Sequence, residues 1–116
     1  MSDMFKVEII TRNSADLEAF KMKMAEIGVS GMTFSHVQGC GLEEGYTELY
    51  RGVKKVQNVF DRLKIEIVVS AVPVDDVIKA ATSALHTGKA GDGKIFVYPV
   101  QQTIDINTGK QGPAAL

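Results

Sequence analysis

Residues 87–94 carry the strongest local signal for ligand chemistry. The segment reads Thr-Gly-Lys-Ala-Gly-Asp-Gly-Lys, with glycines spaced between lysines. Glycine adopts backbone angles that turn amide groups toward a ligand, and lysine supplies positive charge, so the pattern suits an anion such as a chain of phosphates. It is not a Walker A loop, because the Gly-Lys-Ser/Thr ending and the helix after it are absent. On spacing alone, a glycine-rich connector with solvated lysines is about twice as common an explanation, and both alternatives stay open.

A second glycine pair, Gly39 and Gly41, flanks the lone Cys40. The pair can act as a hinge or can let a ligand approach the backbone. Glu43 and Glu44 follow as charges that are usually solvated in a loop. A metal site would need further oxygen ligands, which the sequence does not place.

Composition excludes some classes of partner and compartment. The chain has 116 residues and a net charge of −1, with no block of basic residues, so nucleic acid is an unfavourable partner. A single cysteine cannot form an internal disulfide, which fits a reducing compartment. The first 11 residues resemble neither a signal peptide nor a membrane span. We expect a cytoplasmic protein with one domain over residues 1–116.

Two amphipathic patterns precede the first glycine pair. Alternation over residues 5–11 predicts a strand, and apolar residues at helical spacing after Ser14 predict a helix that Ser14 caps and Gly28 ends. Residues 32–38 alternate again as a strand. Residues 39–62 show no sustained period, which is typical of a functional or disordered segment.

The second half repeats the same order. Residues 63–69 predict a strand, 73–86 a helix, and 95–100 and 103–106 further short strands. The tail over residues 108–116 has nothing evident to pack against, and we expect it to be mobile.

Two such βαβ units form a ferredoxin-like (split βαβ) α+β sandwich with a long loop between strands two and three. Both helices should cover one face of an antiparallel sheet. Ile65, Ile67 and Val69 suggest that the other face is apolar, and self-association would cover it.

Four segments together resemble the PII signalling proteins, the GlnB and GlnK type. They are residues 31–33, 45–52, 64–69 and 87–97, and the match runs without gaps over nearly the whole chain. The resemblance implies a homotrimer with a nucleotide in each cleft between subunits, where ATP and ADP compete and 2-oxoglutarate joins Mg-ATP. It also implies that residues 41–58 form a flexible T-loop that reaches a transporter, enzyme or regulator.

The resemblance assigns roles to individual residues. Gly91 to Lys94 would hold phosphates, Glu66 and Val68 would lie near the base, and Thr33 would come from the adjoining subunit. The implied nucleotide-binding residues are Thr33, Gly39, Gly41, Arg62, Glu66, Val68, Thr87, Lys89, Gly91, Asp92, Gly93, Lys94 and Asn107. The implied partner-binding residues are Tyr46, Tyr50 and Arg51.

The 2-oxoglutarate site departs from the family pattern. Glu43 stands where relatives have a glutamine that helps to hold the metal, and Arg62 stands where they have a lysine. Glu43 remains a candidate ligand for Mg²⁺. Because Glu43 and Glu44 would repel a dianion, we expect 2-oxoglutarate sensing to be lost or much weakened.

The modification and phosphate sites also differ. Lys55 replaces the tyrosine that some relatives uridylylate, and Asp105 and Asn107 replace arginines that reach the phosphates from the adjoining subunit. Two fewer cations and one added anion should weaken the grip on a triphosphate. We therefore expect an altered nucleotide site.

The preferred hypothesis is a sensor of ATP or ADP that regulates a partner, such as a membrane transporter or its ATPase subunit, and is not an enzyme. A nitrogen regulator that responds to 2-oxoglutarate is the first alternative. A small phosphate-handling hydrolase would need an arginine and an asparagine around a phosphate loop, and only Arg12 and Asn13 resemble that pair. An RNA-binding module would need exposed aromatic side chains on the central strands, where the third strand offers Ile65 and Ile67.

Overall fold

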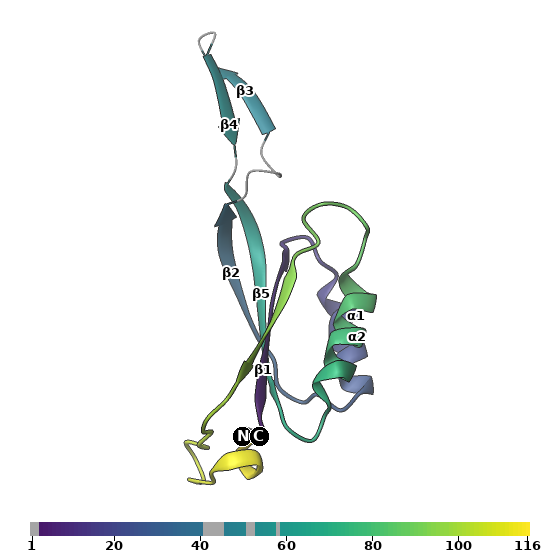
Figure 1. Cartoon of the computed structure of the whole chain (residues 1–116), viewed down its shortest axis with the longest axis vertical. Coiled ribbons are helices and arrows are strands. Elements are labelled where there is room, and N and C mark those ends of the chain that lie inside the picture. The colour runs from purple at the N-terminus through teal and green to yellow at the C-terminus, as the bar shows by residue number, and fades with distance from the viewer. Residues whose placement is uncertain (1–2, 41–45, 51–52, 58) are drawn as a thin grey trace.

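The computed structural model describes residues 3–40, 46–50, 53–57 and 59–116 and has the ferredoxin-like fold that the sequence predicts. Its four main strands and two helices follow in the order β1 (Phe5–Arg12), α1 (Leu17–Glu26), β2 (Thr33–Cys40), β5 (Val59–Val69), α2 (Val74–Leu85) and β6 (Lys94–Pro99). The strands form an antiparallel sheet in the order β2-β5-β1-β6. Both helices lie on one face of it (Figure 1).

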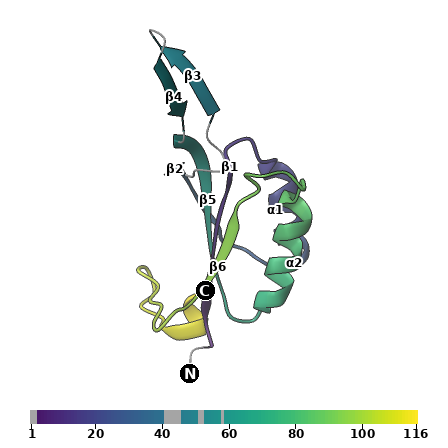
Figure 2. The same ribbon diagram turned by 45° about the horizontal axis from the view of Figure 1, so that its top comes forward.

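The core lies between the sheet and the two helices (Figure 2). Alternate residues of β1 and β5 point into it, so that Val7 lies opposite Ile67 and Ile9 opposite Ile65. Each of these four side chains is at most 1% exposed. The helices contribute apolar stripes with helical spacing, and their buried members are Phe20, Met24, Val77, Ala81 and Leu85.

Helix α1 begins two residues later than the sequence suggested. The expected cap, Ser14, lies in the turn before the helix, whereas Asp16 caps it by accepting a hydrogen bond from the Ala19 amide at 3.1 Å. A capping side chain must reach the amides of the first turn, and Asp16 stands directly before the first helical residue. The predicted end is confirmed, because Gly28 has φ +95° just beyond the helix.

The open face of the sheet is charged, so the expectation that it is apolar is wrong. Ile65, Ile67 and Val69 face the helices instead and belong to the core. The pleat places the intervening residues of β5 and β1 on the other face, among them Lys64, Glu66, Lys6 and Glu8. The helices cover the aliphatic face because burying aliphatic side chains is more favourable than burying charged ones.

The segment without a clear period contains regular structure. Strands β3 (Tyr46–Tyr50) and β4 (Val53–Gln57) pair as a hairpin that projects beyond the end of the sheet (Figure 1). Strand β5 begins at Val59, where Val59 and Phe60 pair with Cys40 and Gly39 of β2. The expectation of an irregular 39–62 is therefore wrong. Residues 59–62 of β5 extend beyond the helices, so no buried face imposes an alternating pattern there.

The C-terminal segment also differs from its prediction. Residues 103–106 form no strand but only an isolated bridge between Ile104 and Gln111. A short 3-10 helix, Gly112–Ala115, follows, and Pro113 and Leu116 line a cavity of about 260 Å³ with residues 28–30 and 68–72. The tail thus has a surface to pack against, contrary to the expectation. Among the described residues, no helix is long and apolar enough to cross a membrane.

Candidate functional site

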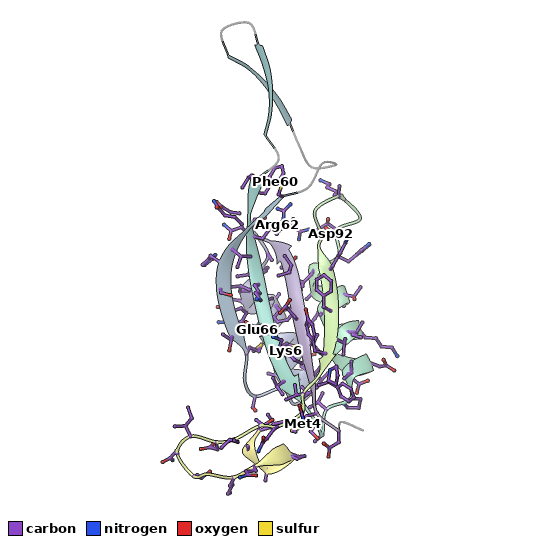
Figure 3. All side chains as sticks on the ribbon, turned by 60° about the vertical axis from the view of Figure 1, so that its left-hand side comes forward. Met4, Lys6, Phe60, Arg62, Glu66 and Asp92 are labelled. Atoms are coloured by element: carbon purple, nitrogen blue, oxygen red, sulfur yellow. The ribbon has the colours of Figure 1, made fainter. Side chains whose placement is uncertain are left out.

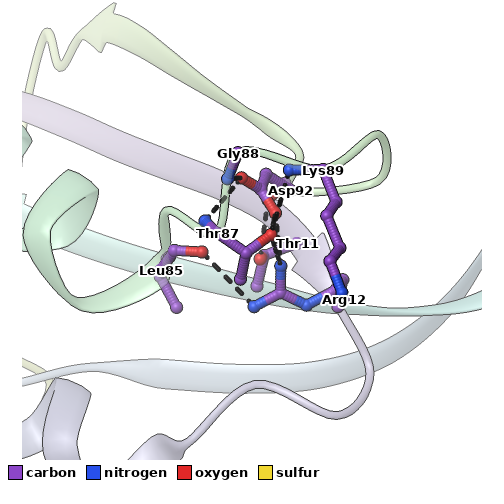
Figure 4. A network of polar contacts seen from close by, with 7 residues as sticks. All are labelled: Thr11, Arg12, Leu85, Thr87, Gly88, Lys89 and Asp92. Carbon is purple, nitrogen blue, oxygen red and sulfur yellow. Dashed lines mark hydrogen bonds and ion pairs between the residues drawn. The ribbon is translucent and has the colours of Figure 1, made fainter.

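The Asp92 carboxylate organises the glycine-rich loop between α2 and β6 (Figure 4). Its Oδ2 accepts hydrogen bonds from the amides of Thr87 at 2.7 Å and Gly88 at 2.9 Å. Its Oδ1 accepts from the Thr87 hydroxyl and from the guanidinium of Arg12. The Lys89 amide in turn donates to the Thr87 hydroxyl oxygen at 3.2 Å. One side chain therefore ties the first turn of the loop together.

These contacts stabilise the ionised form of Asp92. Hydrogen bonds from the Thr87 hydroxyl and amide, the Gly88 amide and the positive charge of Arg12 lower the Asp92 pKa from 3.8 to about 2. The carboxyl is thus charged at neutral pH. The sequence comparison assigned Asp92 to phosphate binding, but a charged carboxylate repels phosphate, so its contacts favour a role in shaping the loop.

Glycine is required where the loop meets β1. Gly88, Gly91 and Gly93 all have positive φ, which side-chain-bearing residues rarely adopt. A Cβ at Gly93 would lie 1.9 Å from the carbonyl oxygen of Ile10, so the two backbones touch. Beside this contact, the Thr11 hydroxyl donates to the Asp92 carbonyl at 2.8 Å. The loop is therefore fixed to the end of β1, and the open alternative of a plain connector loses support.

Two lysines stand on the two sides of the fixed turn. Lys89 and Lys94 are exposed, and Lys94 begins β6 opposite Ile10. The hydrogen bonds around Asp92 and Thr87 use the amides of Thr87, Gly88 and Lys89, and within the described structure none of them uses the Gly91 amide. Exposed cations beside a glycine turn are the arrangement that binds phosphate groups.

Arg62 and Gly39 lie near the same end of the sheet. In the β1–β5 register Arg62 pairs with Arg12, and a Cβ at Gly39 would lie 3.3 Å from Arg62 Cγ. The Arg62 guanidinium carbon is 5.1 Å from the centre of the Phe60 ring, a distance typical of a cation–π contact. Gly39 thus leaves room for the Arg62 stem.

Thr33, Glu66 and Val68 form a second group on the open face, where Glu66 lies beside Lys6 (Figure 3). Thr33 pairs with Glu66 across β2 and β5, and all three residues line a cavity of about 550 Å³. The Glu66 carboxylate lies 2.9 Å from Lys6 Nζ, which lowers the Glu66 pKa and raises that of Lys6. On β1, the register partners of Lys94 and Val68 are four residues apart, or about 13 Å.

Asn107 lies in the C-terminal segment, at the other end of the sheet from the glycine loop (Figure 1). The Asp105 carboxylate accepts hydrogen bonds from the amides of Asn107 at 2.8 Å and Thr108 at 2.9 Å. These bonds lower the Asp105 pKa, the Thr108 amide contributing most. Within one protomer Asn107 and the glycine loop do not meet.

Other predicted site residues lie wholly or partly outside the described structure. Gly41, Glu43 and Arg51 lie outside the described residues, as do the side chains of Tyr46 and Tyr50 at the ends of β3. Over the described ranges, no three His, Cys, Asp or Glu side chains gather as a metal site would require. The metal role of Glu43 and the partner role of Tyr46, Tyr50 and Arg51 stay predictions.

Arg12 is the contributor that the sequence did not assign to this site. It appeared only as part of a faint resemblance to a hydrolase, yet it binds Asp92, and Asn13 instead contacts His36 Nδ1 at 3.0 Å. The arginine–asparagine pair therefore does not surround the loop. Arg12 and Asp92 are 80 residues apart, and no local pattern connects them.

The part of the argument against an RNA-binding sheet that placed Ile65 and Ile67 on the open face needs correction. Ile65 and Ile67 face the helices, whereas the β1–β6 register places Phe96 and Tyr98 on the open face with Glu8 and Lys6. The two aromatic side chains are 42% and 44% exposed. Exposed aromatics are thus present on an edge strand, and the class of protein has to be decided on other grounds.

Comparison with known proteins gives those grounds. The family model described as nitrogen regulatory protein P-II matches residues 4–110. A nitrogen regulatory PII-like protein of Bacillus subtilis is 59% identical over 97% of both chains, and a nitrogen regulatory protein P-II of Azospirillum brasilense is 40% identical over 97% of this chain and all of that one. The solved structure of B. subtilis GlnK matches with a TM-score of 0.83 and 57% identity over 97% of this chain and 98% of that one. A B. subtilis GlnK–ATP complex matches with a TM-score of 0.82 and 50% identity over 97% of each.

Proposed function

Because this chain belongs to the nitrogen regulatory protein P-II family, we propose that it senses ATP and ADP in clefts between the subunits of a homotrimer. In this proposal residues 41–58 carry the signal to a partner protein. The relatives are named as regulatory proteins, which supports signalling over catalysis. The related B. subtilis GlnK structure with ATP supports ATP as the effector.

The observation that carries the proposal is the preorganised glycine loop. Asp92 and Gly93 fix it to β1, and Lys89 and Lys94 present positive charge beside it. A rigid loop with exposed cations binds a chain of phosphates without first losing conformational freedom. The loop is therefore assigned to the phosphates, with Thr87, Gly91 and Lys94 nearest to them.

The position of the second group supports a cleft between subunits. Thr33, Glu66 and Val68 share a cavity that is offset from the glycine loop by about 13 Å along β1. In our proposal these three residues act together on the base, from the subunit adjoining the one whose loop holds the phosphates. In our proposal Arg62 completes the site from the subunit whose loop holds the phosphates, and Asn107 completes it from the adjoining subunit.

Calorimetry with ATP, ADP and AMP tests nucleotide binding. We expect ATP and ADP to bind, and Lys94→Ala to weaken ATP about ten- to hundredfold, because a charge-assisted hydrogen bond contributes about 1.5–3 kcal/mol. Lys21→Ala is the control, since Lys21 on α1 pairs only with Glu18 in the described structure and carries the same charge. Absence of ATP binding to the unmodified protein would refute the proposal.

A second titration tests the altered effector site. Adding 2-oxoglutarate with Mg-ATP should not tighten nucleotide binding, because Glu43 and Glu44 add negative charge where the dianion would dock. A saturable effect of 2-oxoglutarate would favour the alternative, a regulator that responds to both ligands. Repeating the titration with Glu43→Gln shows whether Glu43 is responsible, and repeating it without Mg²⁺ tests its role as a metal ligand.

Capture of a partner tests the output segment. In our proposal the partner is a membrane transporter or its ATPase subunit. We expect it to bind the ATP-bound and ADP-bound protein with different affinity, because a ligand shifts an equilibrium between two conformations only if it binds them with different affinity. Arg51→Ala should abolish capture, and Tyr46→Ala and Tyr50→Ala should weaken it. Capture that ignores both the nucleotide and Arg51 would contradict this part.

A further inference from the structure

Arg12 joins three segments that meet beside the glycine loop. Its Nη1 binds the Asp92 carboxylate and donates to the Thr87 hydroxyl oxygen at 3.2 Å, while its Nη2 donates to the Leu85 carbonyl at 3.3 Å. Leu85 is the last residue of α2, where carbonyls lack helical partners and favour a cation. The end of β1, the end of α2 and the loop are thus held by one side chain (Figure 4).

The negative charge of Asp92 gives the Arg12 contact a consequence for anion binding. The carboxylate binds the loop amides, but its charge opposes any phosphate that approaches Lys89 and Lys94. A carboxylate that shapes the loop but repels the phosphates requires a nearby cation to neutralise its charge. Arg12 supplies that cation, with its side chain only 26% exposed and that of Asp92 only 21% exposed.

Building on the proposed nucleotide binding, we propose that Arg12 is a positioning residue for phosphate recognition. It holds Asp92 against the amides of Thr87 and Gly88 and cancels the negative charge of Asp92, without contacting the phosphates itself. Two consequences distinguish this role. The loss on removing Arg12 grows with the number of phosphates, and it depends on the charge of Asp92.

Titration of Arg12→Ala with ATP, ADP and AMP tests the first consequence. We expect ATP affinity to fall about ten- to hundredfold, ADP affinity to fall less and AMP affinity to change least. Arg12→Lys should recover part of the loss, because it keeps the charge but not the planar fork that reaches Thr87 and Leu85 together. Lys21→Ala, with the same loss of charge on α1, should bind all three nucleotides as the unmodified protein does.

A double-mutant cycle with Asp92→Asn tests the second consequence. Asparagine keeps the size of Asp92 and one acceptor oxygen, which can still receive the loop amides of Thr87 and Gly88, and it removes the charge. The Arg12→Ala loss for ATP should therefore shrink several-fold in that background. An equal loss in both backgrounds would mean that Arg12 contacts the phosphates directly and would overturn the proposal. Equal losses for ATP, ADP and AMP would also overturn it, because a general loosening of the fold acts on all three.

The outcomes separate this inference from the proposed function. If the unmodified protein binds no ATP, nucleotide sensing itself is wrong. If it binds ATP and Arg12→Ala binds equally well, only the role of Arg12 is wrong. Should Arg12→Ala fail to fold by circular dichroism, Arg12→Lys and Arg12→Gln carry the same test, with a larger expected loss for glutamine.

Discussion

The two faces of one sheet differ in how they are stabilised. On the helix side, Val7, Ile9, Ile65 and Ile67 are at most 1% exposed and belong to the hydrophobic core cluster. On the open side, β1 and β5 carry two acidic and two basic side chains that form ion pairs. The same strands supply both sets, one residue apart.

The open-side cluster is defined by Lys6, Glu8, Lys64 and Glu66. Lys6 Nζ lies 2.9 Å from Glu66 and 3.5 Å from Glu8, and Lys64 Nζ lies 3.7 Å from Glu8. Tyr98 donates a hydrogen bond to Glu8 at 3.4 Å. Opposite charges at this spacing are mutually compensated, so a sheet face can be charged and still suit contact with a second copy.

The comparison predicts the largest effect on the helix side. Ile65→Ala should lower the free energy of unfolding by about 2–5 kcal/mol, because it leaves a cavity in the core. Lys64→Ala changes the neighbouring residue on the other face and should cost far less. Chemical denaturation at one protomer concentration measures both, and an equal cost would erase the distinction between the faces.

The open side should control assembly. We expect a particle of three times the 12.6 kDa chain mass by light scattering, and Phe96→Asp should yield monomers that still have native circular dichroism. The control is Val97→Asp on the same strand, since both residues are 42% exposed but point to opposite faces. Dissociation by Val97→Asp alone would place the interface elsewhere.

Thr11 is a buried polar residue on the helix side of the sheet, and it tests how much one hydrogen bond contributes there. It is fully buried and donates through its hydroxyl to the Asp92 carbonyl at 2.8 Å. Thr11→Val keeps the shape and loses that bond, which should lower the free energy of unfolding by about 1 kcal/mol. Thr11→Ser, which keeps the hydroxyl, separates the bond from the lost methyl group, and a neutral Thr11→Val would mean that the bond contributes nothing.

The smallest expected effect is in the acid pH dependence, at the rim where the two faces meet. The Asp92 pKa is about 2 in the folded protein and 3.8 for the unperturbed side chain, which represents the unfolded chain. The stabilisation that ionised Asp92 gives the fold is therefore present above pH 3.8 and is lost as the pH falls toward 2. The difference in unfolding free energy between the unmodified protein and Asp92→Asn should therefore shrink over that range. A difference that is constant from pH 5 to pH 2 would contradict the shift.

Local patterns predicted most elements, and their failures have a common cause. The helix expected over 73–86 is found as Val74–Leu85, and the strand expected over 5–11 as Phe5–Arg12, because each buries a periodic face. The hairpin of β3 and β4 was missed because it projects from the sheet. Asp16 replaced Ser14 as the cap because both residue types cap helices and only the backbone selects between them.

The sequence by itself determined the alternation of β1 and β5, the glycine-rich loop with its lysines, and the resemblance to the PII proteins. It did not decide which face the helices cover, since a period of two sorts side chains into two sets without stating what lies against each. It also did not pair Arg12 with Asp92. Only the tertiary structure brings the end of β1 to the loop, because contacts across 80 residues depend on how the strands are ordered and not on local pattern.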